Sequence, residues 1–167
     1  MSDGILLQPF RFRVDFFQAG KDFVFDARVP LCAAAFSEAS GLEATMEPRT
    51  LREGGRNVGD RQLPGRVTFQ PVVLKRGVTT FQHLWRWFDL VAGRRYAIRL
   101  DARLVVLGPG ADPLTAPGLL EWRMRDCLPT RFRAPTFQAK DHEVAVEELH
   151  FVHQGLSLEP TLPELLE

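Results

Sequence analysis

The chain has 167 residues, 45% of them hydrophobic and 25% charged, which is typical of one folded domain and far from the composition of disordered chains. Lys and Arg number 21 and balance 21 Asp and Glu, which argues against a protein that binds specific nucleic acid, because such proteins are usually strongly basic. Met1 to Gln8 does not resemble a secretory leader, and no apolar stretch reaches membrane-spanning length. We therefore expect synthesis in the cytoplasm without a signal peptide, and no direct membrane insertion.

The N-terminal third of the chain predicts β-structure. Apolar and charged residues alternate from Phe10 to Phe16, the period-two pattern of a half-buried strand. A second strand is expected from Asp22 to Val29, where Pro30 ends it because proline cannot donate to a sheet ladder. Leu42 to Glu53 is a long extended segment of mixed character, which we expect to be exposed or at a sheet edge.

The next segment has the composition of a long loop. Gly54 to Gly65 contains four glycines and a proline, so it has little capacity to bury itself. Structureless loops of about a dozen residues are uncommon inside compact domains and are usually functional or disordered. The loop is therefore a candidate partner-binding element. Val67 to Leu74 then predicts another strand, in which Pro71 favours an edge position or a bulge.

One helix is expected from about residue 80 to residue 92. Its apolar side chains recur at the helical spacing i, i+3, i+4 and i+7, namely at Phe81, Leu84, Trp85 and Phe88. Thr80 is the expected N-cap, and Gly93 ends the pattern. Trp87 lies beside this stripe, so it either widens the buried face, which is the favoured alternative, or meets another subunit.

The C-terminal half predicts more strands. Tyr96 to Leu107 alternates in hydropathy and is joined to Leu119 to Cys127 by a turn rich in glycine and proline, which indicates a β-hairpin. The last strand, His142 to His153, carries valines on one face and then Leu149 and Phe151 on the other. This change of phase implies a bulge or a strand that is covered on both faces.

These elements give six to eight strands and one helix without β-α-β alternation, which indicates a mainly β sandwich or barrel. We expect a single β domain over residues 1–156. The tail, residues 157–167, is expected to be mobile or held by a partner.

Residues with catalytic or metal-binding chemistry are present but poorly arranged. Cys32 and Cys127 lie in no C-x-x-C pair and in no nucleophile motif. The H-x-x-H pair at His150 and His153 lacks a third ligand, and the glutamates near it suit the solvated face of a strand. The chain is therefore expected to be no enzyme and to use no cofactor or metal.

Several arginines alternate with aromatic residues on the predicted strands: Arg11, Arg13, Arg123, Arg125, Arg131 and Arg133. Such alternation is also found in platforms for single-stranded nucleic acid. The neutral total charge favours a solvated sheet face instead.

Four sequence blocks then point to a known family. They are FSEASGLE beginning at Phe36, EGGRN beginning at Glu53, LKRGVTTFQHLWRWF beginning at Leu74 and EVAVEELHFVHQGL beginning at Glu143. In this order, and over nearly the whole chain, they resemble the inner-tube proteins of contractile phage tails and of related extracellular injection systems. Four separated blocks in one order are far more specific than any single short motif.

This resemblance implies two packed antiparallel sheets with one helix, six subunits per ring and a continuous β-barrel around a lumen. Its implied partners are further copies of the chain, adjacent tube rings, the baseplate hub and spike, and the sheath. The particle containing it would be assembled in the cytoplasm and, in some systems, released. Candidate contacts between rings or subunits are Leu51, Arg52, Glu53, Gly54, Gly55, Arg56, Asn57, Leu63, Pro64, Gly65, Arg66, Lys75, Arg76, Gly77 and Trp87.

Within the family, two roles remain open. The residue sequence from Gly41 to Gly59 is more similar to that of the baseplate-proximal tube initiator than to that of the repeated tube subunit. Segments beyond a minimal tube subunit, such as Gly20 to Ala35, offer additional surface to an asymmetric neighbour. The alternative from another class is a monomeric β-sandwich binding module or small hydrolase, which would require a concave pocket with converging polar groups.

Overall fold

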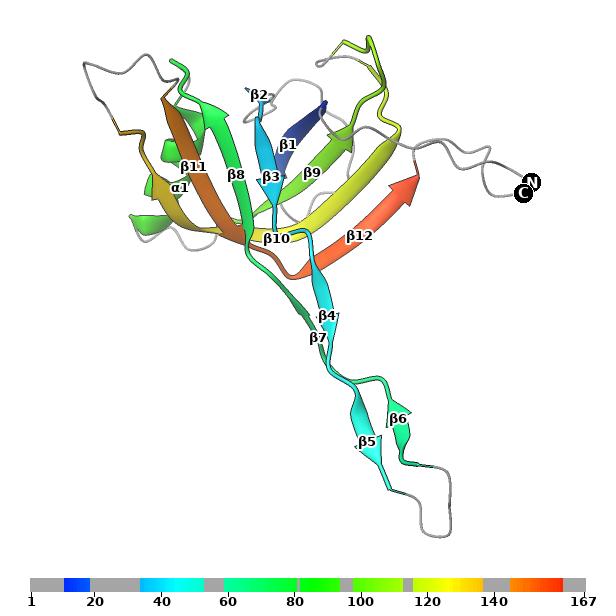
Figure 1. Cartoon of the computed structure of the whole chain (residues 1–167). Helices are drawn as coiled ribbons and strands as arrows, with labels where there is room; N and C mark the ends of the chain where they lie inside the picture. Colours follow the sequence, from blue (N-terminus) through cyan, green and yellow to red (C-terminus); the bar gives the residue numbers. More distant parts are fainter. Residues whose placement is uncertain are drawn as a thin grey trace.

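A computed structural model describes residues 11–18, 34–52, 59–80, 82–93, 98–112, 116–136 and 145–160. The molecule is mainly β with one helix, as the sequence predicts (Figure 1). The described residues form twelve strands, more than the six to eight expected, because several extended segments are broken into short pieces. The strand predicted at Asp22 to Val29 lies outside the described residues.

The first sheet region consists of antiparallel strands in the order β2-β1-β9-β10-β12. Their bounds are Phe12–Gln18 for β1, Ala34–Ala35 for β2, Leu100–Val106 for β9, Leu120–Arg133 for β10 and Gly155–Pro160 for β12. The predicted hairpin is confirmed, because β9 and β10 pair antiparallel. The expected tail is corrected over residues 157–160, because these residues pair with β10 as part of β12.

The second sheet region has the order β10-β11-β8-β3. Strand β11 spans Val146–Val152, β8 spans Val72–Gly77 and β3 spans Glu38–Ser40. Strand β10 belongs to both regions: its first half pairs with β9 and β12, and its second half pairs with β11. The two regions curve around a shared apolar core (Figure 1).

Two irregularities in β10 make this sharing possible. The register against β9 shifts between Met124 and Cys127, where Asp126 has a positive φ of 59°. The register against β11 shifts between Pro129 and Arg131. Proline is tolerated at such a bulge, although it has no N–H to donate to the ladder. Each extra residue reverses the alternation of faces. Met124, Cys127 and Phe132 therefore all pack on the core, although Cys127 follows Met124 by three positions and Phe132 follows Cys127 by five.

The helix α1 spans His83–Ala92 and covers one end of the core. It ends at Gly93 as predicted, with the Gly93 amide donating to the Asp89 carbonyl oxygen, 2.8 Å away. The N-cap prediction is wrong: Gln82 occupies that position and makes no capping hydrogen bond through its side chain. The helix begins three residues after Thr80.

The predicted buried stripe of α1 is also partly wrong. The buried residues are Leu84, Trp87 and Val91, whereas Trp85 is 44% exposed. The Trp87 ring lies 5.2 Å from the Phe16 ring and 6.2 Å from the Phe151 ring, centroid to centroid. Trp87 therefore packs in the core, which confirms the favoured alternative and removes Trp87 from the candidate subunit contacts.

The change of phase in the last strand results from a buried ion pair. Strands β8 and β11 pair in one continuous register, with Glu147 directly opposite Arg76. Both side chains lie on the core side, where they form a buried ion pair. Val146 consequently points outward and is 40% exposed. Glu147 thus takes the inward place, and the bulge lies in the neighbouring β10.

Strand β8 also begins later than predicted. The expected strand Val67 to Leu74 is broken before Val72, with Pro71 just outside β8. Pro71 thus marks the place where the chain leaves the sandwich.

Strand β9 is buried on both faces, which a simple alternation would not indicate.

Replacing Glu147 by Gln should destabilise the fold by about 3–5 kcal/mol, because the buried Arg76 guanidinium would lose its balancing charge. Urea unfolding followed by circular dichroism would measure the loss. Replacing both residues by Met should cost less than the single change, because no uncompensated charge would remain.

The neighbouring Glu148→Gln provides the control. Glu148 lies on the outward side of β11 and contacts the mostly exposed Arg133 at 3.7 Å, so its loss should cost about 1 kcal/mol or less. Equal losses for Glu147→Gln and Glu148→Gln would contradict the importance of the buried pair.

Candidate functional site

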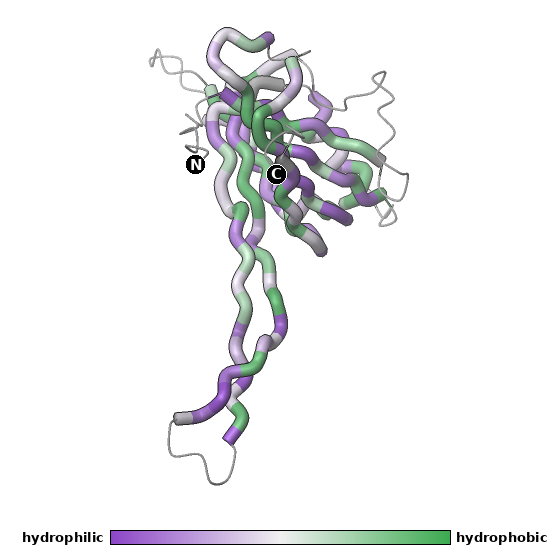
Figure 2. The backbone as a smooth tube through the Cα atoms, turned by 90° about the vertical axis from the view of Figure 1, so that its right-hand side faces the viewer, coloured by the Kyte–Doolittle hydropathy of each residue, from purple (hydrophilic) through white to green (hydrophobic). Residues whose placement is uncertain are grey.

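A two-stranded arm projects from the sandwich between β3 and β8 (Figures 1 and 2). Its proximal half pairs β4, Ala44–Met46, with β7, Val67–Phe69. Its distal half pairs β5, Arg49–Leu51, with β6, Arg61–Leu63. Residues 53–58, which lie between β5 and β6 in the sequence, are outside the described residues.

Two glycines allow close backbone contacts in the arm. Gly41 has a φ of 86°, and a Cβ atom there would lie 2.0 Å from the Pro71 carbonyl oxygen at the root of the arm. A Cβ atom on Gly65 would lie 1.7 Å from the Glu47 carbonyl oxygen, between the two halves. Neither position has room for a side chain, so both glycines set how closely the two strands of the arm approach.

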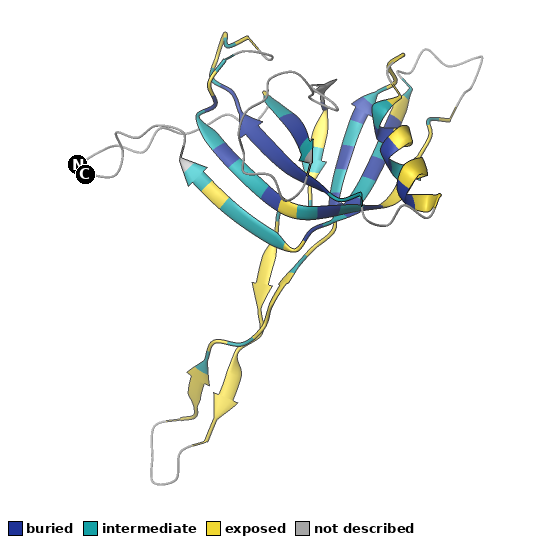
Figure 3. Ribbon diagram, turned by 180° about the vertical axis from the view of Figure 1, so that it is seen from behind, coloured by how far each residue is buried: buried dark blue, intermediate teal, exposed yellow. Residues whose placement is uncertain are grey.

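The arm is exposed along its length (Figure 3). This confirms the predicted exposure of Leu42 to Glu53 for the residues that the structure describes. The predicted loop Gly54 to Gly65 is corrected in part, because Arg61–Leu63 forms strand β6. A short strand was missed here because glycine and proline on both sides of it dominate the local composition.

The predicted contact residues lie in different parts of the chain. Leu51, Arg52, Leu63, Pro64, Gly65 and Arg66 lie on the arm. Glu53, Gly54, Gly55, Arg56 and Asn57 fall outside the described residues. Lys75, Arg76 and Gly77 belong to strand β8.

Arg76 and Trp87 are not available to a neighbouring subunit. Arg76 is 1% exposed and paired with Glu147, and Trp87 is 3% exposed. Lys75 pairs with Glu38 at 2.9 Å, and this hydrogen bond raises the pKa of the Lys75 ammonium. Of the predicted contacts, the arm residues therefore have the best access to a partner.

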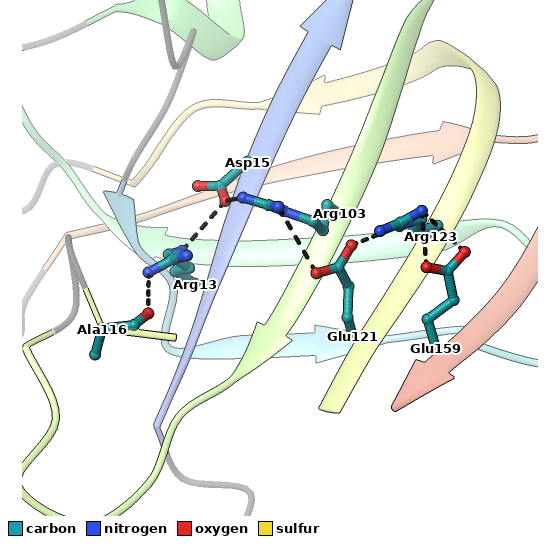
Figure 4. Close-up of polar contacts among 7 residues, drawn as sticks. All are labelled: Arg13, Asp15, Arg103, Ala116, Glu121, Arg123 and Glu159. Atoms are coloured by element: carbon teal, nitrogen blue, oxygen red, sulfur yellow. Dashed lines mark hydrogen bonds and ion pairs between the residues drawn. The ribbon is translucent and has the colours of Figure 1, made fainter. Parts of the chain in front are cut away.

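A row of ion-paired arginine and carboxylate side chains crosses the first sheet region from β1 to β12 (Figure 4). Asp15 accepts from Arg13 at 3.2 Å and from Arg103 at 2.8 Å. Glu121 lies 3.7 Å from Arg103 and 2.5 Å from Arg123. We call this row, with Glu159 at its end, the charged ladder.

The charged ladder is buried in its middle and open at one end. The side chains of Asp15, Arg103 and Glu121 are 7–9% exposed, whereas Glu159, 2.8 Å from Arg123, is 44% exposed. Three guanidinium groups balance three carboxylates, so no net charge is buried. The ladder links four adjacent strands through their side chains, in addition to their backbone hydrogen bonds.

The sequence pattern marks two of the ladder's three arginines, Arg13 and Arg123, but not their environment. Arg11, Arg125, Arg131 and Arg133 are exposed, as expected for a solvated sheet face. Arg13 and Arg123 are instead held in the ladder, with side chains 11% and 27% exposed. Arg103 was missed, because its partner Asp15 lies 88 residues away in sequence.

His153 lies at the root of the arm. Its ring centroid is 5.0 Å from that of Phe69 in β7, and its Nδ1 donates to the Gly155 carbonyl oxygen at 3.1 Å. The Nε2 atom is buried and has no hydrogen-bond partner in the described ranges. Burial lowers the pKa of His153 below its ordinary value of 6.5, although the bond to Gly155 acts in the opposite direction.

Other reactive groups are few. Burial raises the pKa of the Cys127 thiol to about 12, so a thiolate nucleophile at neutral pH is not available at this position. Within the described ranges, no three His, Cys, Asp or Glu side chains are grouped so as to hold a metal ion. No helix in the described part of the chain is both long and apolar enough to cross a membrane.

Comparison with known proteins identifies the family to which this fold belongs. The sequence profile of the T4-like virus tail tube protein gp19 matches residues 8–157. The chain belongs to this tail tube family. The resemblance inferred from the four sequence blocks is thereby confirmed, and the family is one of structural proteins.

Solved structures agree with the tail tube assignment. The sheath-tube complex of the extracellular contractile injection system PVC contains a chain with 20% identity and a TM-score of 0.70, covering 93% of this chain and 92% of that one. The baseplate of the anti-feeding prophage AFP contains one with 26% identity and a TM-score of 0.69, covering 96% and 99%. Hcp1 from Flavobacterium johnsoniae shares the fold, with 13% identity, a TM-score of 0.52 and coverage of 89% and 95%. No curated protein sequence matches the chain.

The pKa of His153 leads to a prediction for this tail tube protein. Because the folded pKa lies below 6.5, the unfolded chain binds the proton more readily, and stability should fall as the pH drops below about 6.5. His153→Asn retains an N–H donor for Gly155 but cannot titrate. Thermal unfolding between about pH 5 and pH 8 should therefore depend less on pH in the variant. Parallel curves for the two proteins would show that His153 does not contribute.

Proposed function

We propose that this tail tube protein forms a six-membered ring at the baseplate end of the inner tube, where it initiates tube assembly. The observation that carries this proposal is the match to the AFP baseplate. That chain is 26% identical, compared with 20%, 20% and 19% for the matches in the PVC sheath-tube complex, the AFP cap and the PVC terminator. The AFP baseplate structure is six-fold symmetrised.

The sheet edges support ring formation. Within the described residues, β12 pairs only with β10, and β3 pairs only with β8, so each has one edge without a partner. Unpaired strand edges favour association, and a heterologous contact between two different edges closes into a ring when the rotation allows it. A ring of this chain would cover both edges in the same contact.

The charged ladder supports a mechanical role. A tube that is driven as a rigid body must transmit force across its sheets. Backbone hydrogen bonds already join β1, β9, β10 and β12, and the ladder adds side-chain contacts across the same four strands. The partners in this proposal are further copies of the chain, the baseplate hub and spike, the next tube ring and the sheath, within a phage-tail-like particle.

The second candidate is the repeated subunit of the main tube. It is favoured by the match to the PVC sheath-tube complex, whose TM-score of 0.70 is practically equal to the 0.69 of the AFP baseplate match. Negative-stain electron microscopy with light scattering separates the two candidates. Stacked rings of the purified chain would favour the repeated subunit. Rings that appear only when baseplate hub protein is added, with the mass of six 18.9 kDa chains plus the hub, would favour the initiator.

We also propose that the arm contacts the adjacent ring. Met46 and Val67 are directly opposite each other, so a two-residue Asn-Gly turn between them can replace residues 47–66 and close a short hairpin. We expect this variant to fold with a melting temperature close to that of the full chain, because the arm lies outside the core. It should form single rings but no stacks with the next ring. Stacking at the level of the full chain would contradict the role of the arm.

A further inference from the structure

The corner at which β11 turns into β12 lies at the root of the arm (Figure 1). His153 and Gln154 form this corner, and the Gln154 amide donates to the Arg125 carbonyl oxygen of β10 at 2.9 Å. The corner is therefore held on the sandwich through its backbone. His153 is 7% exposed, and its ring packs on Phe69 of β7. This ring contact joins a strand of the arm to the sandwich.

The direction of the arm depends on the packing at its root. Within the described part of the chain, the arm strands β4, β5, β6 and β7 pair only with one another. The two backbone connections to the sandwich pass through Gly41, whose φ is 86°, and Pro71. Glycine has wide freedom in φ and ψ, so this junction can absorb a change of direction. The contact between Phe69 and His153 therefore restrains a junction at which the backbone can bend.

The hydrogen bond to Gly155 determines where the neutral His153 ring carries its proton. The Gly155 carbonyl oxygen can only accept, so Nδ1 carries the N–H. The Nε2 atom then has a lone pair and no hydrogen, and it is buried without a partner among the described residues. Leaving a neutral acceptor unpaired in this place costs less free energy than leaving a charged donor unpaired. The neutral ring is thus the form that suits this site.

Protonation at Nε2 gives the His153 ring a positive charge and a second N–H. The face of an aromatic ring attracts a cation. Phe69 nevertheless offers no oxygen that could replace the water bound by a solvated imidazolium. Burial lowers the pKa of His153, and this effect exceeds the opposite effect of the bond to Gly155. The imidazolium is therefore more stable in water than against Phe69.

Charges on the neighbouring elements do not offset this cost. Within the described ranges, burial and the bond to Gly155 are the causes that shift the pKa of His153, and no ion pair involves its ring. The ionisable residues on or beside the elements around it are Glu43 before β4, Arg66 before β7, Lys75 and Arg76 on β8, Arg125 and Asp126 on β10, Glu147, Glu148 and His150 on β11, and Glu159 on β12.

We propose that His153 is a pH-sensitive latch for the arm: the neutral ring packs on Phe69 and holds the arm in one direction, and the imidazolium turns toward water and releases it. The released arm bends at Gly41 and Pro71, while the sandwich stays folded. The latch operates within a single chain, so it goes beyond the proposed ring and does not require it. Its signature is a change in the direction of the arm before the sandwich unfolds as the pH falls.

Energy transfer between two dyes on one chain measures the direction of the arm. In a Cys32→Ser background, the dyes are attached to Gln62→Cys on the arm and Arg86→Cys on α1, both exposed positions. Cys127 is fully buried and stays unlabelled, and an excess of unlabelled chain prevents transfer between molecules. We expect one narrow distance distribution at about pH 8 and a broad one at about pH 5, with unchanged far-UV circular dichroism.

Two histidine variants identify the titrating group. His153→Asn keeps an N–H donor for Gly155 but cannot titrate, so its distance distribution should stay narrow at both pH values. His150→Asn is the matched control, because His150 lies on the same strand and contacts Glu148 at 3.4 Å, away from the arm. The His150→Asn distribution should broaden at low pH as in the wild type.

Phe69→Ala tests the latch from the side of the arm. Coupling between two groups is reciprocal, so a change that frees the arm must also affect the protonation of His153. Without the Phe69 ring, the distance distribution should already be broad at about pH 8. The pKa of His153, followed by NMR of its ring protons, should rise toward 6.5 because burial is reduced.

The contrary results are distinct from failure of the ring proposal. A narrow wild-type distribution at low pH, equal broadening in His153→Asn, or a His153 pKa that Phe69→Ala leaves unchanged would each overturn the latch. Broadening that occurs only together with loss of circular dichroism would also overturn it, because the sandwich itself would then be unfolding. None of these results bears on ring formation, which electron microscopy measures separately.

Discussion

The backbone pairing of β10 is the constraint on which the other features depend. This single strand hydrogen-bonds to β9 and β12 along its first half and to β11 along its second half, so both sheet regions share it. The sharing requires two extra residues, one of them next to the positive φ of Asp126, whose amide donates to the Asp101 carboxylate at 2.8 Å. Without these irregularities, the residues after Met124 would present the wrong face to the core. The helix, the ladder and the root of the arm all take their positions from the curvature that results.

Buried charge fixes the register on both sides of β10. In the second sheet region, the core-facing row of β8 and β11 ends in the Arg76–Glu147 pair. A slip of β11 by one residue would turn Glu147 outward, place Glu148 inward and leave Arg76 opposite the wrong side chain. In the first region, the charged ladder requires Asp15, Arg103 and Glu121 to be adjacent across three strands. Such pairs contribute little net stability compared with apolar residues of the same size, so their effect is on which strand alignment is lowest in free energy.

The sequence predicts the features that depend on local pattern. The strand β1, the β9–β10 hairpin and the end of α1 at Gly93 are confirmed, because each depends on residues close together in the chain. The half-buried character expected of β1 is wrong, since Asp15 on its charged side is only 6% exposed. Trp85 was placed in the buried stripe but is 44% exposed, whereas Trp87 is buried, as favoured, because Phe16 and Phe151 pack against it. The inward position of Glu147 could not be seen without Arg76, which lies 71 residues earlier. Leu51 and Leu63 were recognised as contact candidates, but their placement on one side of the arm follows only from the pairing of β5 with β6.

The arm presents an energetic problem that the single chain does not solve. An isolated two-stranded hairpin is marginally stable in water, and this one exposes Met46, Leu51 and Val67. Gly41 and Gly65 allow the close backbone contacts that set its path, but they bury none of this apolar surface. In the proposed assembly, the adjacent ring supplies the missing second layer. The free energy gained by covering the apolar side chains of the arm is then available only on assembly. Burial of the arm and association of subunits thus become one coupled equilibrium. Such coupling suits a component that must remain separate until a growing tube presents the complementary surface.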